Sequence, residues 1–124
     1  MSHVIAAVST GSQVSAIGIL RLSGEDCAEI AGKVFQRNNG APLSDAPDRK
    51  LVLGVLRDRE GRVIDQCLAV YTRGPHSYTG EDAVEFQCHG SPAVLAAGLR
   101  ALFANGFRQA LAGEFTRRAF LSGQ

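Results

Sequence analysis

The most regular alternation of apolar and polar positions lies at residues 83–89, whose sequence is AVEFQCH. Successive side chains of a β-strand point to opposite faces, so this pattern predicts a strand with one apolar and one polar face. The polar face carries Glu85, Gln87 and His89. We expect the apolar face to pack on a core, and the polar face either to face water or to line a ligand pocket.

Shorter apolar runs predict further strands. Residues 3–9 are rich in β-branched residues and are followed by the turn-prone sequence TGSQ. Residues 16–24 form a second run, in which Ile17, Ile19 and Arg21 share one face. Arg21 therefore ends an otherwise apolar row. It either reaches solvent at the strand end or serves a ligand.

A β-hairpin is predicted for residues 51–74, where two strands flank the sequence DREG and Gly61 is available for a positive φ angle. A further short strand is expected after residue 106. Between these strands, a helix is predicted for residues 23–36, with Ser23 and Asp26 resembling a capping box. Its expected buried positions are Cys27, Ile30, Ala31, Val34 and Phe35.

Two later segments also have helical periodicity. The first begins with Ser91 as the cap and Pro92 at the first helical position, and it ends at Asn105. Its expected buried stripe is Leu95, Leu99, Leu102 and Phe103. The second follows Gly113, with its inner side expected at Phe115, Ala119 and Phe120.

The succession of strands and helices predicts an α+β fold, a mixed β-sheet with helices packed on one face. A chain of 124 residues is long enough for one domain with its own core. The last helical pattern is interrupted at Gln124. We therefore expect residues 1–124 to be the first domain of a longer protein.

Composition and charge narrow the classes of function. With 45% hydrophobic and 20% charged residues, the chain has the composition of a folded globular protein. A net charge of +1 disfavours an independent RNA-binding domain, which needs a strong basic field. The N-terminus has no signal-peptide pattern and no segment has the length of a membrane span, so we expect a cytoplasmic protein.

The three cysteines are Cys27, Cys67 and Cys88, with no CxxC pair and no neighbouring paired histidine. This spacing argues against a zinc site, and no metal site is predicted. We expect all three to be structural thiols of a reducing compartment.

Several catalytic motifs are missing from the sequence. There is no G-x-S-x-G nucleophile elbow, no G-x-x-x-x-G-K-[ST] phosphate loop and no G-x-G-x-x-G dinucleotide motif. His89 could act as a base, although a local hydrogen bond is the simpler expectation. Arg21, Glu85 and the C-terminal sequence FTRRAFLSGQ could gather into a polar cluster that suits a flat heterocycle.

Three strings carry a family resemblance, namely AIGILRLSG, GPHSYTGEDAVEFQCHGSPAVL and GEFTRRAFLSGQ. In this order they resemble the N-terminal domain of the tRNA modification GTPase family called MnmE or TrmE, and the resemblance spans essentially the whole chain. It implies a fold like the tetrahydrofolate-binding domain of aminomethyltransferases and homodimerisation through this domain. It also implies binding of a reduced folate such as 5-formyltetrahydrofolate.

The same resemblance implies partners and cofactors for the parent protein. With the flavoprotein MnmG, such proteins modify the wobble uridine of tRNA, and the folate supplies the one-carbon unit. GTP hydrolysis, with Mg²⁺ and K⁺, belongs to a later domain, so residues 1–124 alone are expected to have no GTPase activity and no catalytic residue.

Carried over by position, the folate contacts fall on Arg21, Glu85 and Gln124. The last position is usually Lys in the family, and residues 13–16 read QVSA where many members read GRGG. The resemblance suggests that Glu85 accepts paired N–H donors from a pterin edge. The competing interpretation is a dimerisation or protein-interaction module without a ligand, in which Arg21 and Glu85 form a structural ion pair.

Overall fold

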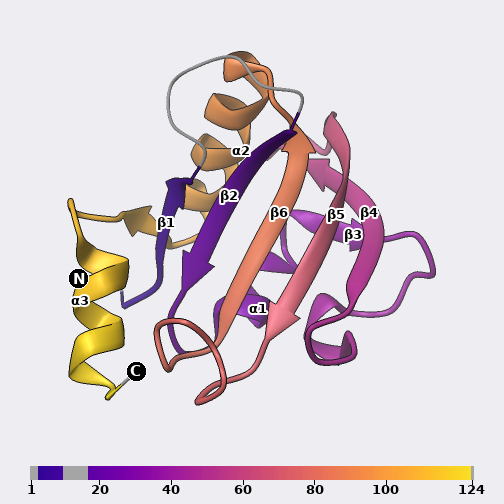
Figure 1. The fold of residues 1–124 in the computed structure, drawn as a ribbon. Helices are drawn as coiled ribbons and strands as arrows, with labels where there is room; N and C mark the ends of the chain where they lie inside the picture. Colours follow the sequence, from indigo (N-terminus) through magenta and orange to yellow (C-terminus); the bar gives the residue numbers. More distant parts are fainter. Residues whose placement is uncertain (1–2, 10–16, 124) are drawn as a thin grey trace.

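A computed structural model describes residues 3–9 and 17–123. Its centre is a seven-stranded sheet in the order β3-β4-β5-β6-β2-β1-β7 (Figure 1). Neighbouring strands are antiparallel except β1 and β7, which are parallel, so the sheet is mixed. The strands are β1 (Ile5–Val8), β2 (Ile17–Ser23), β3 (Phe35–Arg37), β4 (Leu51–Arg57), β5 (Val63–Thr72), β6 (Ala83–His89) and β7 (Arg108–Gln109).

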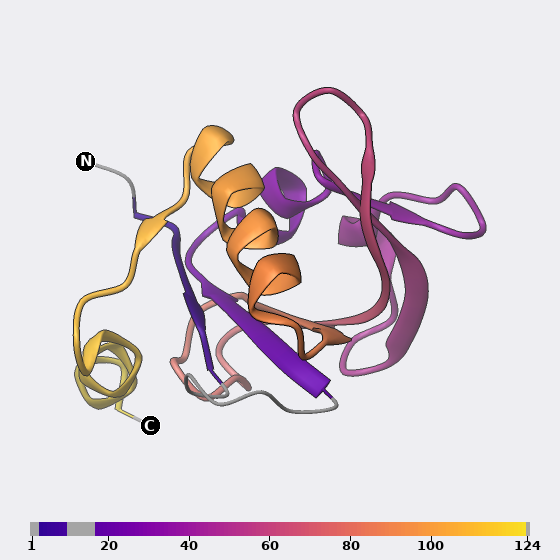
Figure 2. The ribbon, with the colours of Figure 1, turned by 90° about the horizontal axis from the view of Figure 1, so that it is seen from above.

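The helices lie on one face and at one edge of this sheet. Helix α2 (Pro92–Ala104) crosses the face formed by β1, β2, β5 and β6, and α1 (Cys27–Ala31) lies on the same side (Figure 2). Helix α3 (Glu114–Leu121) stands at the edge next to β1, and a short 3-10 helix, η1 (Leu43–Asp45), packs beside α1. The α+β prediction with a mixed sheet is confirmed.

Strand β6 has the two faces that its alternation predicts. Val84, Phe86 and Cys88 are buried on the side of α2, whereas Glu85 and Gln87 are only partly buried on the other side. The predicted hairpin is also present, with Gly61 at a φ of 81°. Both features follow from local rules, namely side-chain alternation and the positive φ that glycine tolerates.

Packing in the core depends on a close approach between α2 and β2. The Cα of Gly98 lies so near the sheet that an added Cβ would be 2.7 Å from Cδ1 of Leu20. Around this point Leu20, Leu22 and Leu102 are fully buried. The missing side chain of Gly98 thus lets the helix backbone seat directly on the strand.

The helix predicted for residues 23–36 is wrong in its length and in its cap. Ser23 is the last residue of β2, and α1 covers only Cys27–Ala31, with Asp26 at a φ of 66° and no side-chain cap. Phe35, expected on this helix, lies in β3, pairs with Leu56 and places its ring centroid 5.2 Å from that of Phe86. Strand pairing and aromatic packing outweigh the local helical period here.

Two aromatic residues that were predicted to lie in the buried stripes of their helices are exposed. In α2, Leu95 and Leu102 are buried as expected, but Phe103 is 37% exposed because Gly98 and Ala101 face the sheet instead. In α3, Ala119 is buried and Phe120 is 79% exposed. Helix α3 lies at the sheet edge and has little apolar surface to cover, so its inner stripe is narrower than the sequence suggests.

All three cysteines are buried and unpaired, as the spacing predicted. Burial raises the pKa of the Cys27 thiol, and the contact with Cys88 together with burial raises the pKa of the Cys67 thiol. Both groups therefore stay protonated at neutral pH. Within residues 3–9 and 17–123, no helix is long and apolar enough to cross a membrane.

Candidate functional site

Arg21 and Glu85, which the sequence singled out, are directly opposite each other on β2 and β6. The Arg21 Nε and Nη2 atoms lie 3.2 Å and 3.1 Å from Oε1 of Glu85. Both side chains are about one-third exposed, on the sheet face that α1 and α2 leave uncovered. The sheet register therefore brings two of the three predicted site residues into one ion pair.

A cavity of about 190 Å³ opens over this ion pair. Its floor includes Arg21 and Glu85, and β5 contributes Val70 and Thr72. Further parts of its wall come from neighbouring residues of β2 and β6, from the loop after β5 and from Phe115 at the start of α3. The cavity thus combines one charged pair with apolar, aromatic and hydroxyl side chains, a composition that suits a small organic ligand.

The loop of residues 73–82, between β5 and β6, is folded over the cavity by Asp82. Its carboxylate accepts hydrogen bonds from the Gly74 N–H at 2.9 Å and from the Tyr71 hydroxyl at 3.4 Å. Burial and the charge of Asp82 raise the pKa of Tyr71 to about 12, so the phenol remains a donor. Ser77 donates to the Glu81 carbonyl and closes the loop upon itself.

Two aromatic residues, Tyr78 of the loop and Phe115 of α3, line the cavity. The Tyr78 hydroxyl lies 3.2 Å from Oγ1 of Thr116, which joins the loop to α3. The guanidinium of Arg21 lies 6.0 Å from the centroid of the Phe115 ring, at the outer limit of a cation–π contact. Tyr78 is 58% exposed, so its ring is available to a ligand.

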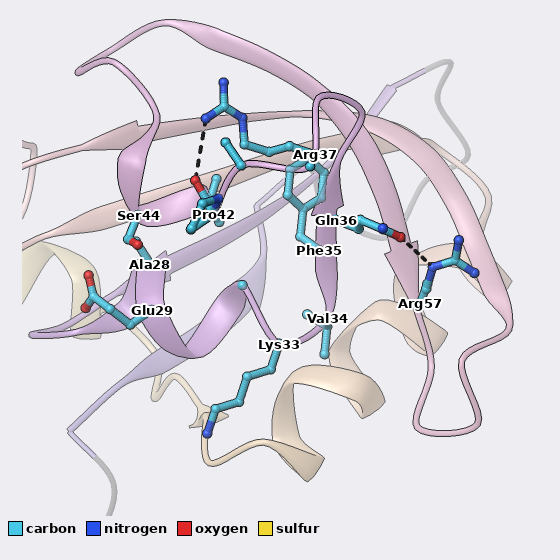
Figure 3. A pocket seen from close by; sticks show the side chains of 14 residues that line it. Ala28, Glu29, Lys33, Val34, Phe35, Gln36, Arg37, Pro42, Ser44 and Arg57 are labelled. Atoms are coloured by element: carbon cyan, nitrogen blue, oxygen red, sulfur yellow. Dashed lines mark hydrogen bonds between the residues drawn. The ribbon is translucent and has the colours of Figure 1, made fainter.

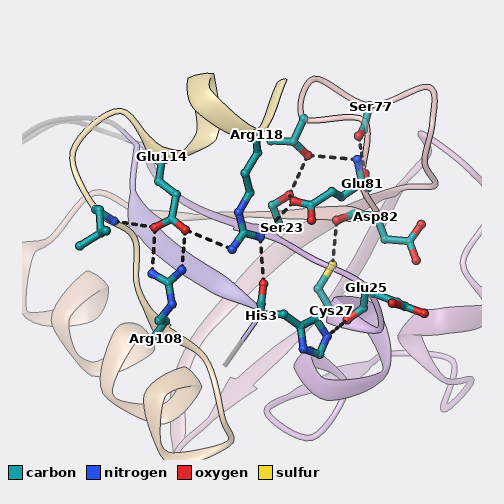
Figure 4. A network of polar contacts seen from close by, with 12 residues as sticks. His3, Ser23, Glu25, Cys27, Ser77, Glu81, Asp82, Arg108, Glu114 and Arg118 are labelled. Carbon is teal, nitrogen blue, oxygen red and sulfur yellow. Dashed lines mark hydrogen bonds and ion pairs between the residues drawn. The ribbon is translucent and has the colours of Figure 1, made fainter. Parts of the chain in front are cut away.

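A polar network attaches α3 to the sheet (Figure 4). Glu114 accepts a hydrogen bond from Nη1 of Arg108 at 2.8 Å and from Nη2 of Arg118 at 3.1 Å. Hydrogen bonding to Arg108 is the main reason that the pKa of Glu114 falls to about 2. Arg118 in turn reaches Oε1 of Glu81 at 3.0 Å and the His3 carbonyl at 2.8 Å.

Ser23 connects this network to the end of β2. Its hydroxyl donates to Oε1 of Glu81 at 2.9 Å and lies 2.7 Å from Oγ1 of Thr79. Ser23 is fully buried and Thr79 nearly so. The hydroxyl predicted to cap a helix instead ties β2 to the loop that covers the cavity.

A larger cavity, of about 470 Å³, lies between α1, β3 and η1 (Figure 3). Its charged side chains do not converge. Arg57 donates to Gln36 at 3.2 Å and to the Gly61 carbonyl at 2.9 Å, and Arg37 points toward the Pro42 carbonyl. This cavity has volume but no gathered polar groups, so the smaller cavity is the better candidate.

His89 makes the local hydrogen bond that was the simpler expectation. Its Nδ1 lies 2.7 Å from Oδ1 of Asp65, and its backbone N–H donates to Oδ2 of the same carboxylate at 2.8 Å. His89 lies at the end of β6 away from Arg21, so it is not part of the cavity.

The third predicted contact, Gln124, and the departure at residues 13–16 lie outside the described residues. Sequence reasoning missed Tyr78 in the cavity and Glu81 in the network that joins the loop to α3, whereas Phe115 belongs to the C-terminal sequence expected to gather with Arg21 and Glu85. The signal that could have found Tyr78 and Glu81 is the run of polar side chains in the sequence HSYTGED directly before β6. Ser23 gave a second signal, because a small hydroxyl at the end of an apolar strand needs a buried partner.

Comparison with known proteins gives a match over nearly the whole chain. Residues 4–124 match the family described as GTP-binding protein TrmE N-terminus. The chain is 44% identical to a protein of Symbiobacterium thermophilum over 98% of its length, and 46% identical to one of Thermus thermophilus over 97%. Both relatives are called tRNA modification GTPase MnmE, and the chain spans only 27% of the length of each.

Proposed function

The chain belongs to the family described as GTP-binding protein TrmE N-terminus, and from this premise we propose that it is the folate-binding N-terminal domain of a tRNA-modifying GTPase. The ligand is a reduced folate, 5-formyltetrahydrofolate or another one-carbon tetrahydrofolate. The observation that carries this proposal is the cavity over β2 and β6, where Arg21 and Glu85 stand beside two aromatic rings. The likeness of the fold to the folate domain of aminomethyltransferases belongs to the same proposal.

The chemistry of the ion pair suits a pterin ring. Both contacts from Arg21 reach Oε1 of Glu85, so we assign the other carboxylate oxygen, Oε2, to the N–H donors at the ring edge. Arg21 holds the carboxylate in one orientation, which lowers the entropy lost when the ligand binds. The rings of Tyr78 and Phe115 supply apolar surface for the faces of the ligand.

Gln124 is the third proposed contact. Where many family members have a lysine, this chain presents a carboxamide. A carboxamide can donate and accept hydrogen bonds but carries no charge, so its contact with folate is a neutral hydrogen bond. We therefore assign most of the charge recognition in this chain to Arg21 and Glu85.

We also propose that the domain forms a homodimer. The sheet face not covered by α1 and α2 exposes Ile17, Leu51 and Leu53, each more than half accessible. A shallow groove of about 340 Å³ runs between Ile17, Leu53 and Leu68 on this face. An apolar face of this kind on a domain of 124 residues suits a two-fold contact with a second copy.

The longer protein is proposed to act in the cytoplasm with the flavoprotein MnmG on the wobble uridine of tRNA. The relatives are named for a GTPase, and the chain spans about a quarter of their length. The sequence has no phosphate-binding loop, so we assign GTP, Mg²⁺ and K⁺ to another part of the longer protein. Residues 1–124 alone should not hydrolyse GTP.

The alternative function is a dimerisation or interaction module without a ligand. The ion pair of Arg21 with Glu85 fits this alternative as well, because cross-strand charge pairs also stabilise sheets. Calorimetric titration of the chain with 5-formyltetrahydrofolate separates the two functions. Saturable binding of one ligand per chain supports the folate site, and the absence of binding supports the interaction module.

A further inference from the structure

Helix α3 is held against the rest of the domain mainly by charged groups. Of its eight residues only Ala119 is buried, while Phe120 and Leu121 are more than 70% exposed. Yet α3 supplies Phe115 to the cavity wall and Thr116 to the contact with Tyr78. The position of this cavity wall therefore depends on polar contacts rather than on a packed apolar stripe.

Arg118 makes the contacts that bridge α3 to the opposite wall. Its side chain is 17% exposed, and its guanidinium reaches Glu114 on its own helix and Glu81 in the loop of residues 73–82 (Figure 4). Glu114 is itself fixed by Arg108 and by the Leu111 N–H at 2.9 Å. Arg118 is thus held in place by Glu114 and contacts the loop through Glu81.

The loop side of this bridge is equally fixed. Glu81 accepts from Arg118 and from the buried hydroxyl of Ser23 on the same atom, Oε1. Ser23 also contacts Thr79, the neighbour of Tyr78. Loss of Arg118 would therefore remove a contact that joins the wall carrying Phe115 to the loop carrying Tyr78.

We propose that Arg118 is a positioning residue for the folate cavity, one that sets the separation of its two walls without lining it. This inference rests on the proposed folate-binding function and adds a residue to it. Arg118 and Glu81 are not among the residues that line the cavity, so we assign neither of them a contact with the ligand. Arg118 affects ligand binding through the distance that it sets between Phe115 and Tyr78.

The test compares Arg118→Met with Arg117→Met. Methionine keeps much of the side-chain length and removes the charge, and Arg117 is the adjacent, exposed arginine of the same helix, so the control makes the same change in net charge. Calorimetric titration with 5-formyltetrahydrofolate should give an affinity about tenfold or more weaker for Arg118→Met, because the loss of its contacts with Glu81 and Glu114 leaves the two walls less well positioned for the ligand. Arg117→Met should bind within about twofold of the wild type.

A second measurement reports the solvent accessibility of the α3 wall in the protein without ligand. The chain has no tryptophan, so a Phe115→Trp background provides a single tryptophan on α3 at the cavity wall, which can be excited selectively over the two tyrosines. Acrylamide should quench this fluorescence more strongly when Arg118→Met is added, and not when Arg117→Met is added. Glu81→Gln breaks the bridge from the loop side and should change affinity and quenching in the same direction, which provides a second test if Arg118→Met does not fold.

The outcomes separate this inference from the proposed function. If the wild type binds folate and neither Arg118→Met nor Glu81→Gln weakens binding beyond the control, the positioning role is wrong and the folate site stands. If the wild type binds no folate, the proposed function is wrong. Quenching that is unchanged by both Arg118→Met and Glu81→Gln overturns the positioning role whether or not folate binds.

Discussion

At the residue scale, a substitution of Glu85 can distinguish a role in stability from a role in ligand binding. It is one-third exposed and paired with Arg21, and exposed ion pairs of this kind contribute about 0–1 kcal/mol to stability. Its burial is too small for a core role. Its position at the floor of the cavity argues for a role in ligand binding.

We therefore predict that Glu85→Gln weakens binding of 5-formyltetrahydrofolate by roughly 5- to 150-fold, because an acceptor becomes a donor that faces ligand donors. The melting temperature without ligand should barely change. Calorimetric titration and thermal melts measure the two quantities, with Glu60→Gln in the distant hairpin as the control. An affinity within about twofold of the wild type would exclude Glu85 as a ligand-binding carboxylate.

Glu114 gives a prediction about pH. Its pKa is lowered from 4.5 to about 2 in the folded chain, chiefly by hydrogen bonding to Arg108. A lowered folded-state pKa means that Glu114 stabilises the fold fully above its unfolded pKa and loses this contribution as the pH falls through the folded pKa. Wild type should thus exceed Glu114→Gln in free energy of unfolding at neutral pH.

This excess should shrink as the pH falls from 4.5 to about 2, the interval between the two pKa values. Urea denaturation of both proteins across this interval measures it. A difference in unfolding free energy that stays constant over the whole interval would show that the ion pairs of Glu114 do not stabilise the fold.

At the scale of elements, we predict that substitution by alanine destabilises the domain to different degrees at two glycines, Gly54 and Gly98. An added Cβ at Gly54 in β4 would lie 2.4 Å from the Gln36 carbonyl oxygen, and backbone atoms cannot easily move aside. At Gly98 in α2 the nearest atom is the flexible end of Leu20. Gly54→Ala should destabilise the domain by about 1–3 kcal/mol, and Gly98→Ala by less, because Leu20 can shift and alanine favours the helix.

Chemical denaturation of the two variants and the wild type measures this contrast. The expected result is a larger loss of unfolding free energy for Gly54→Ala. Equal losses would mean that β3 and β4 can separate to accept a methyl group, contrary to the tight register around Gly54.

The elements also show which parts of the fold the sequence predicts. Strand β6 and the hairpin at Gly61 follow from alternation and turn chemistry, which act over a few residues. The helix expected at residues 23–36 fails because Ser23 bonds to a loop more than 50 residues away and Phe35 pairs with β4. Contacts between distant segments leave no helical or strand period in the sequence, so periodicity alone could not have revealed them.

The candidate site also has a part that the sequence predicts and a part that it does not. Arg21 could be singled out because it ends an apolar row of its strand, and Glu85 because it lies on the polar face of an alternating strand. The family resemblance placed them together. The bridge from Arg118 to Glu81 joins segments 37 residues apart through a loop. Its geometry depends on where α3 stands at the sheet edge, which follows only from the assembled fold.

At the scale of the whole molecule, the uncovered sheet face predicts the oligomeric state. Leu53→Glu places a charge in the centre of the proposed two-fold contact, where burying an unpaired charge opposes association. Light scattering should give the mass of a dimer for the wild type and of a monomer for Leu53→Glu. Leu111→Glu, at an exposed leucine beside α3, is the matched control and should remain dimeric. A wild type that is monomeric at high concentration, or a dimer unaffected by Leu53→Glu, would contradict this interface.

The central claim is that the cavity over β2 and β6 is a folate site centred on Arg21. The most direct measurement is a calorimetric titration of wild type and Arg21→Met with 5-formyltetrahydrofolate, paired with thermal melts without ligand. We predict saturable binding of one ligand per chain for the wild type and an affinity at least about tenfold weaker for Arg21→Met, with nearly equal melting temperatures. Equal affinities for the two proteins, or no binding by the wild type, would contradict the account.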